Sequence, residues 1–227
     1  MLSEYSPAYK NFSPSDIDPL VWVKNSIPQI IPGRQHIVAV IGPSASGKDA
    51  ILNGVTIPFA HIRTLTTRPE RTDEQQLDRA YTFVSQEKFA ALHTKGAFIE
   101  TIPLGTHESG TTKQAVIEAM QQNTGLAVWR GEETGLKKLW PWLQTFYPAF
   151  QRHVVFILPE MPMQDVIKRI IEKRGRANSG WRIKQAYNEI LSVGSGADYI
   201  LLNPPQIGGP KDAAAAMEKL FTSLLSR

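Results

Sequence analysis

The sequence predicts an α/β fold in three layers, in which a central parallel sheet is covered by helices on both faces. Apolar runs typical of buried strands alternate along the chain with amphipathic stretches typical of helices. A loop rich in small residues joins the first clear strand to the first helix. Because parallel strands need crossover connections, usually helices, this alternation is typical of a parallel sheet with helices on both faces.

Residues 1–35 are expected to form an extension, and residues 36–227 one folded domain. The extension contains prolines that would interrupt regular structure repeatedly, at Pro7, Pro14, Pro19, Pro28 and Pro32. A short helix over residues 14–24, with Trp22 packed on the domain, stays open as an alternative to an irregular chain.

The elements of the domain follow from apolar runs, helical spacing and end signals. Strands are expected at residues 36–41, 60–64, 126–129, 154–158 and 198–203. Helices are expected at 49–55, 85–93, 111–122, 163–173, 183–193 and 212–226. Ser85 is placed to cap the second helix, and Gly125 to close the third.

Composition narrows the class of protein. The 227 residues are 42% hydrophobic and 20% charged, as in ordinary globular domains, and no apolar run reaches the ~18 residues of a membrane span. The amino end lacks the pattern of a secretory signal. The absence of cysteine excludes disulfides and thiolate chemistry, and the five histidines have no zinc-site spacing. We therefore expect a cytoplasmic protein without membrane contacts.

The formal charge of +4 is concentrated in residues 168–184. Such a run is compatible with small anionic substrates, with nucleic acid or simply with a solvated helix face. A duplex-binding protein more often spreads its charge along a whole face, so we do not expect a nucleic-acid partner.

The loop GPSASGKD, residues 42–49, has the pattern that holds polyphosphate. Its small residues allow backbone N–H groups to surround phosphate oxygens, and Lys48 adds an ammonium that reaches the β and γ phosphates. The expected ATP-binding residues are therefore Gly42, Pro43, Ser44, Ala45, Ser46, Gly47, Lys48 and Asp49. Asp49 stands where a Mg²⁺-binding Ser or Thr is usual, and is a candidate to face the metal.

Four further motifs resemble those of guanylate kinases: TLTTRPER at 64–71, YTFVS at 81–85, GAFIE at 96–100 and GTT at 110–112. The resemblance covers about residues 36–205. It implies a P-loop NTPase fold with a core at 36–62 and 125–227, a nucleoside-monophosphate-binding region at 63–113 and an arginine lid at about 174–182. It also implies ATP with Mg²⁺ as phosphoryl donor, and small nucleotides as partners.

The resemblance assigns the acceptor site residue by residue. Arg68, Arg71 and Tyr81 would hold the acceptor phosphate, because guanidinium groups bind phosphate in a planar, permanently charged fork. Three residues would contact the guanine, namely Glu100 at its N1–H and 2-amino group, Thr64 at its O6, and Thr111 nearby. Glu132 falls at the second of two aspartates that guanylate kinases carry after a central strand.

The lid segment EKRGRAN, residues 172–178, completes the resemblance. Arg169, Arg174 and Arg182 would close over the transferring phosphoryl group together with Lys48, since cations stabilise the charge on its oxygens. Asn203 resembles a position near the donor adenine. We expect ATP-dependent phosphorylation of GMP or dGMP.

Three positions depart from the guanylate kinase pattern. Arg130 replaces the first of the two aspartates, Ser109 replaces a phosphate-binding tyrosine, and Asp49 replaces a hydroxyl residue. We hypothesise that Asp49 and Arg130 exchange charge, with Asp49 either facing the metal or pairing with Arg130.

Two other functions stay open. GKD in the loop and the lid segment also resemble ribose 1,5-bisphosphate phosphokinases, so that sugar phosphate or another small phosphate is an alternative acceptor. Guanylate-kinase-like domains also serve as binding modules without catalysis, which the changes at Arg130 and Ser109 favour and the intact Lys48 and arginine lid oppose. The oligomeric state does not follow from the sequence.

Overall fold

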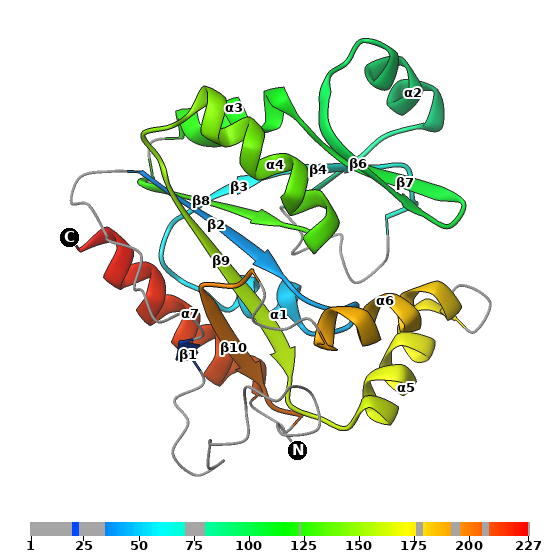
Figure 1. Cartoon of the computed structure of the whole chain (residues 1–227), viewed down its shortest axis with the longest axis vertical. Coiled ribbons are helices and arrows are strands. Elements are labelled where there is room, and N and C mark those ends of the chain that lie inside the picture. Colours follow the sequence, from blue (N-terminus) through cyan, green and yellow to red (C-terminus); the bar gives the residue numbers. More distant parts are fainter. Residues whose placement is uncertain are drawn as a thin grey trace. The chain divides into compact units, whose positions relative to one another are not determined.

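The computed structural model describes residues 20–22, 35–70, 80–122, 124–175, 179–191, 196–205 and 209–226 (Figure 1). The helices are α1 (Lys48–Asn53), α2 (Gln86–Thr94), α3 (Lys113–Gln121), α4 (Glu133–Phe146), α5 (Met163–Arg174), α6 (Gly180–Leu191) and α7 (Gly209–Leu225). The strands are β1 (Leu20–Trp22), β2 (His36–Ile41), β3 (Ala60–Ile62), β4 (Thr64–Thr66), β5 (Tyr81–Phe83), β6 (Phe98–Leu104), β7 (His107–Thr112), β8 (Leu126–Arg130), β9 (Gln151–Pro159) and β10 (Tyr199–Asn203).

The larger sheet has the strand order β1-β10-β9-β2-β8-β3. The pairs β10 with β9 and β3 with β8 are parallel, whereas β1 runs antiparallel to β10. All six residues of β2 are buried, as are all five of β8 and of β10. Continuous burial of mostly apolar residues is typical of parallel strands. The predicted α/β fold with a central parallel sheet is confirmed.

The smaller sheet has the order β5-β4-β7-β6 and mixes parallel and antiparallel pairs. Its register brings together residues that are distant in sequence. Thr64 on β4 lies opposite both Tyr81 on β5 and Thr111 on β7, and Thr111 lies opposite Glu100 on β6. A register shift between Phe98 and Glu100 interrupts the alternation of β6 just before Glu100.

The chain divides into two compact units. One contains Val40–Ile57 and His153–Arg227, and the other contains Gly33–Ala39 and Pro58–Arg152. In the first unit, α7 packs against α1 and β10. In the second, α3 packs against β3 and β7, and α4 against β6 (Figure 1).

Several predicted elements are confirmed, and their ends have local causes. Strand β2 occupies the predicted residues 36–41, and α2 begins as predicted, because the Ser85 hydroxyl accepts a hydrogen bond from the Lys88 N–H at 3.2 Å. The predicted strand at 60–64 is wrong at its end. It stops at Ile62, and Thr64 begins a strand of the smaller sheet.

Other elements differ from the predicted ones, and the strands β5, β6 and β7 were not predicted. A helix from residue 111 is incorrect, since Thr111 and Thr112 belong to β7 and the Thr112 hydroxyl caps α3. The alternative of a helix over 14–24 fails for Leu20–Trp22, which form β1; residues 1–19 and 23–34 lie outside the described part. Helix α4, which contains Pro141, was not predicted.

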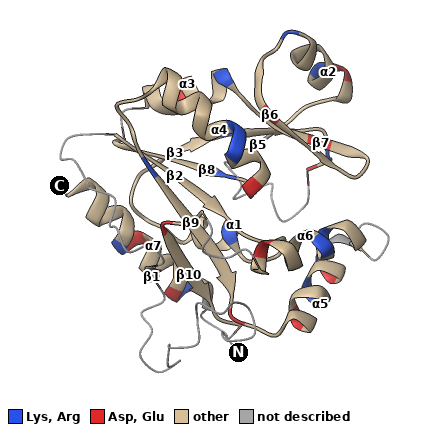
Figure 2. Ribbon diagram, viewed as in Figure 1, with Lys and Arg blue, Asp and Glu red and all other residues tan. Residues whose placement is uncertain are grey.

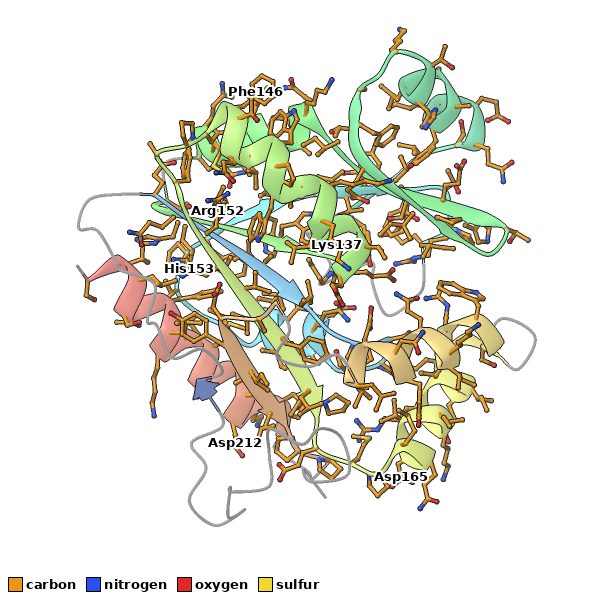
Figure 3. The ribbon with its side chains drawn as sticks, in the orientation of Figure 1. Lys137, Phe146, Arg152, His153, Asp165 and Asp212 are labelled. Carbon is orange, nitrogen blue, oxygen red and sulfur yellow. The ribbon has the colours of Figure 1, made fainter. Side chains whose placement is uncertain are left out.

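The surface charge is mixed. On α5, Lys168, Arg169 and Lys173 alternate with Asp165 and Glu172, and Figure 2 shows both signs of charge on that helix. On α4, Lys137 forms an ion pair with Glu133 at 2.9 Å. At the end of the same helix, the apolar side chain of Phe146 is 62% exposed (Figure 3).

Within the described residues, none of the helices has the length and apolar character required to cross a membrane.

Candidate active site

The predicted phosphate loop connects β2 to α1 in the first compact unit. Three of its residues have positive φ angles, 141° at Gly42, 65° at Ala45 and 92° at Gly47. A Cβ atom on Gly42 would collide with the backbone carbonyl of Ile157 on β9, so this position requires glycine. The Ser46 N–H donates to the Pro43 carbonyl at 3.1 Å and closes the turn.

Lys48 lies across this loop. Its Nζ donates to the carbonyl of Gly42 at 2.5 Å and to that of Pro43 at 3.0 Å. The Ser44 hydroxyl is buried and has no hydrogen-bond partner among the described residues. A buried donor without a partner is costly, so it marks a place where a ligand oxygen would be accepted.

Asn203 at the end of β10 braces the same loop. Its Nδ2 donates to the Ser46 carbonyl at 2.7 Å, and its side chain occupies the space that a Cβ on Gly47 would need. Asn203 is 3% exposed, and its Oδ1 lacks a hydrogen-bond partner within the described ranges. This geometry makes Asn203 a support of the loop; its expected contact with adenine stays a prediction.

The remaining donor-side residues lie on helices of the first unit. Asp49 is exposed in the first turn of α1, which is only six residues long. Arg169 is partly buried on α5, and the Arg182 guanidinium on α6 lies 4.3 Å from the centre of the Trp181 ring. Arg174 ends α5, but its side chain and residues 176–178 are outside the described part.

A cluster of rings and guanidinium groups in the second unit contains the predicted acceptor-phosphate residues. The Arg68 guanidinium lies 4.8 Å from the Tyr81 ring centre and 5.1 Å from that of Phe83. Arg130, only 8% exposed, lies 4.4 Å from the same Tyr81 ring. The structure therefore brings Arg68 and Tyr81 together as predicted and adds Arg130. The predicted Arg71 falls outside the described residues.

Ser109 does not supply the hydroxyl that the missing tyrosine would have provided. Its Oγ donates to the carbonyl of Leu65 on the neighbouring strand at 3.2 Å. Ser109 is buried, and its hydrogen bond is made within the smaller sheet.

The predicted base-reading residues form a buried network in the same unit. The Thr111 hydroxyl donates to Glu100 Oε1 at 2.6 Å, and the indole N–H of Trp129 donates to Thr111 Oγ1 at 2.8 Å. Glu100 Oε2 is buried and has no hydrogen-bond partner among the described residues. Thr64 is buried on β4, directly opposite Thr111.

The electrostatic environment of Glu100 is dominated by burial. Loss of solvation raises the pKa of Glu100, and the Thr111 hydrogen bonds oppose that rise. Lys138 on α4 also lowers this pKa and Glu132 raises it, so both are within electrostatic range of the Glu100 carboxylate. Glu132 is partly buried immediately before α4, and its predicted role in binding the substrate stays a prediction.

Two residues of this network were missed by the sequence analysis. Trp129 is 1% exposed and resembles any other apolar strand residue in the sequence. Gly135 allows the network to approach α4, since a Cβ there would lie 3.2 Å from both Glu100 Oε2 and the Trp129 ring. Neither residue carries a sequence signal that distinguishes it from core packing.

Metal ligands do not gather in the described ranges, where no group of three or more His, Cys, Asp or Glu residues could hold an ion. Asp49 and Arg130 belong to different compact units. The exchange of charge between them stays a prediction.

Comparison with known proteins agrees with this geometry. The sequence model of the guanylate kinase family matches residues 34–203. A guanylate kinase of Cupriavidus metallidurans is 27% identical, covering 74% of this chain and 76% of its own length. A guanylate kinase of Nitrosococcus oceani is 29% identical, covering 75% and 81%. The crystal structure of guanylate kinase from Anaplasma phagocytophilum has a TM-score of 0.58 at 17% identity, covering 86% and 89%, which supports the fold alone.

The fold, the loop and these matches define a phosphotransferase that acts on nucleotides. More narrowly, the chain belongs to the guanylate kinase family.

Proposed function

We propose that this enzyme transfers the γ-phosphoryl group of ATP to GMP or dGMP. The observation that carries the proposal is the buried Glu100 carboxylate, which has one oxygen held by Thr111 and the other without a partner among the described residues. Guanine presents an N1–H and a 2-amino group side by side, and a carboxylate accepts from both. Glu132, close enough to influence Glu100, adds a second acceptor at the same edge.

The preference for guanine over adenine follows from the free-energy cost of leaving one oxygen of this carboxylate without a hydrogen-bond donor. Adenine has neither the N1–H nor the 2-amino group, so an adenine in the same place would leave Glu100 Oε2 buried without a donor. A buried charged group without its partner costs on the order of 3 kcal/mol or more, which corresponds to roughly a hundredfold or greater preference.

Arg68, Tyr81 and Arg130 are proposed to hold the acceptor phosphate, with Arg71 added from the sequence resemblance. Two guanidinium groups lie within 5 Å of the centre of one phenol ring. A dianionic phosphate would draw the like charges together and receive several charge-assisted hydrogen bonds. Arg130 would thereby replace the donor that is absent at Ser109, whose hydroxyl is used within the sheet.

The donor side is proposed to hold ATP through the loop at residues 42–49. Lys48 would leave the carbonyl groups of Gly42 and Pro43 for the β and γ phosphates, and the buried Ser44 hydroxyl would donate to a phosphate oxygen. Arg169, Arg174 and Arg182 are the proposed lid cations. The ionised acceptor phosphate is already a nucleophile, so no residue need remove a proton from it.

A Mg²⁺ ion fits the residues present. Asp49 is an exposed carboxylate next to Lys48, and Mg²⁺ with ATP is usually held by one or two carboxylates together with phosphate oxygens and water. When bound, Mg²⁺ would neutralise charge on the phosphate oxygens.

The test is a panel of acceptors. The full-length protein is given MgATP with GMP, dGMP, AMP, UMP, CMP or ribose 1,5-bisphosphate, and ADP release is followed for each. We expect turnover with GMP, dGMP or both and little with the others. Preference for ribose 1,5-bisphosphate would instead support the alternative indicated by Asp49 and the lid segment. Binding of GMP without ADP release would support a non-catalytic binding module.

A further inference from the structure

The network at Glu100 spans three strands of the second unit. Trp129 comes from β8, Thr111 from β7 and Glu100 from β6. Their exposed fractions are 1%, 0% and 3%, so the hydrogen bonds of 2.8 Å and 2.6 Å that join them are shielded from water. Shielded bonds of this kind are stronger and better defined than exposed ones.

The direction of each proton in this network is determined by chemistry. An indole nitrogen is a donor only, so Trp129 must occupy a lone pair of the Thr111 oxygen. An ionised carboxylate is an acceptor only, so the single hydroxyl proton of Thr111 must point to Glu100 Oε1. Thr111 therefore has no proton left to donate to a ligand.

The network also determines which oxygen of Glu100 is available. Oε1 is held by Thr111, whereas Oε2 is buried and has no hydrogen-bond partner within the described part of the chain. Gly135 on α4 lies close to that oxygen, since a Cβ there would lie only 3.2 Å from Oε2. The same Cβ would lie 3.2 Å from the Trp129 ring, which is therefore packed directly beneath the start of α4.

We propose that Trp129 is a positioning residue for base selectivity, acting through Thr111 to orient the Glu100 carboxylate. The proposal rests on the proposed function, because the base in question is guanine. Trp129 keeps the Thr111 hydroxyl turned toward Glu100, and Glu100 thereby presents Oε2 to the donors of the base. Thr111 acts on the carboxylate and does not donate to the guanine O6.

The test compares variants that each remove one hydrogen bond, and Thr111→Val does so without changing the shape of the side chain. Thr111→Val and Trp129→Phe each remove a donor, and Thr111→Ser keeps the hydroxyl. Trp142→Phe makes the same tryptophan change on α4, away from the network. Loss of one buried hydrogen bond predicts roughly a fivefold to tenfold rise in KM for GMP and a similar fall in the GMP over AMP preference. The kcat should stay within about twofold, since the reacting phosphates are untouched.

Trp142→Phe is expected to behave like the wild type. Thr111→Ser is expected to restore most of the KM and selectivity that Thr111→Val loses, and melting temperatures are recorded for all variants. The proposal is overturned if Trp129→Phe changes KM and selectivity no more than Trp142→Phe does, or if Thr111→Val equals Thr111→Ser. A parallel fall in kcat for both substrates would indicate general loss of packing, and would also overturn it.

A second readout separates this inference from the proposed function. The indole N–H resonance of Trp129 is assigned by its disappearance in Trp129→Phe among the five tryptophans. Thr111→Val should shift that resonance and speed its exchange with solvent, whereas Thr111→Ser should not. If the wild type neither binds nor phosphorylates GMP, the proposed function is wrong, and the role in selectivity is wrong with it. The resonance then still decides whether the hydrogen-bonded network exists.

Discussion

The guanidinium group of Arg130 lies 4.4 Å from the centre of the Tyr81 ring, and that of Arg68 lies 4.8 Å from the same centre. The resemblance to guanylate kinases predicts an aspartate where Arg130 stands, and arginine carries the opposite charge. In this chain the reversed charge lies beside residues predicted to bind phosphate. If these residues bind the acceptor phosphate as proposed, Arg130 adds a positive charge to the same site.

Arg130 should contribute to the affinity for the acceptor. Arg130→Met keeps much of the side-chain volume and removes the charge, and we expect KM for GMP to rise about tenfold or more, as for loss of a charge-assisted hydrogen bond. For Arg130→Lys we expect a KM for GMP between those of the wild type and Arg130→Met, because an ammonium keeps the charge but cannot form a bidentate contact. The matched control is Arg152→Met, whose guanidinium donates to Gln144 at the surface. Equal KM values in Arg130→Met and the control would refute the role.

The predicted exchange of charge between Asp49 and Arg130 has a separate test. Asp49→Ser and Arg130→Asp should each lower turnover, and the double variant should recover part of the loss. Coupled residues typically show an interaction energy of about 0.5–3 kcal/mol in such a cycle, whereas independent sites are additive. Strictly additive losses would mean that Arg130 acts at the acceptor without reference to Asp49.

Lys48 should be needed for transfer and not for acceptor binding. Its Nζ contacts lie within the loop of the first unit, whereas the acceptor residues belong to the second. Lys48→Ala should therefore abolish ADP release while the dissociation constant for GMP, measured by calorimetry, stays within about twofold. A large loss of GMP affinity in this variant would mean that the two sites are wrongly assigned.

The raised pKa of Glu100 predicts opposite effects of pH on stability and on binding. Burial is the largest cause of the rise. The pKa of this carboxyl is higher in the folded protein than in the unfolded chain, so its ionisation destabilises the fold. The destabilisation is complete at pH values above the folded pKa and absent at pH values below the unfolded pKa. Glu100→Gln should thus be more stable than the wild type at neutral pH, with the difference shrinking in acid. Urea unfolding at several pH values measures the difference in free energy of unfolding between the two proteins. A difference that does not change with pH would contradict this prediction.

Binding of GMP should weaken as pH falls, since only the ionised Glu100 accepts from guanine. Because its pKa is raised, this loss should begin at a higher pH than for an ordinary glutamate. Lys138 and Glu132 act on the same carboxylate, so Lys138→Met should raise that pH further.

The sequence was most informative where local signals coincide with tertiary structure. Residues 37–41 are all apolar and form most of a buried strand, and three of the residues after it, Gly42, Ala45 and Gly47, have the positive φ angles of a phosphate loop. Glu100 and Thr111 were identified through motifs, and the register of β6 and β7 brings them together.

Other features could not be predicted because their causes are not local. Helix α4 contains Pro141 and two tryptophans, which are weak helix signals, and its stability comes from burying residues such as Leu139 and Leu143. The strands of the smaller sheet contain many polar residues, so β7 lacks a clear alternation. The contact of Trp129 with Thr111 depends on a cross-strand arrangement that one strand does not encode.

The central claim is that Glu100 selects guanine, and the ratio of kcat/KM for GMP to that for AMP tests it most directly in the wild type and in Glu100→Gln. We predict a ratio of roughly a hundred or more in the wild type, falling by at least tenfold in the variant, with most of the change in KM. An equal ratio in the two proteins, with both folded, would contradict the claim.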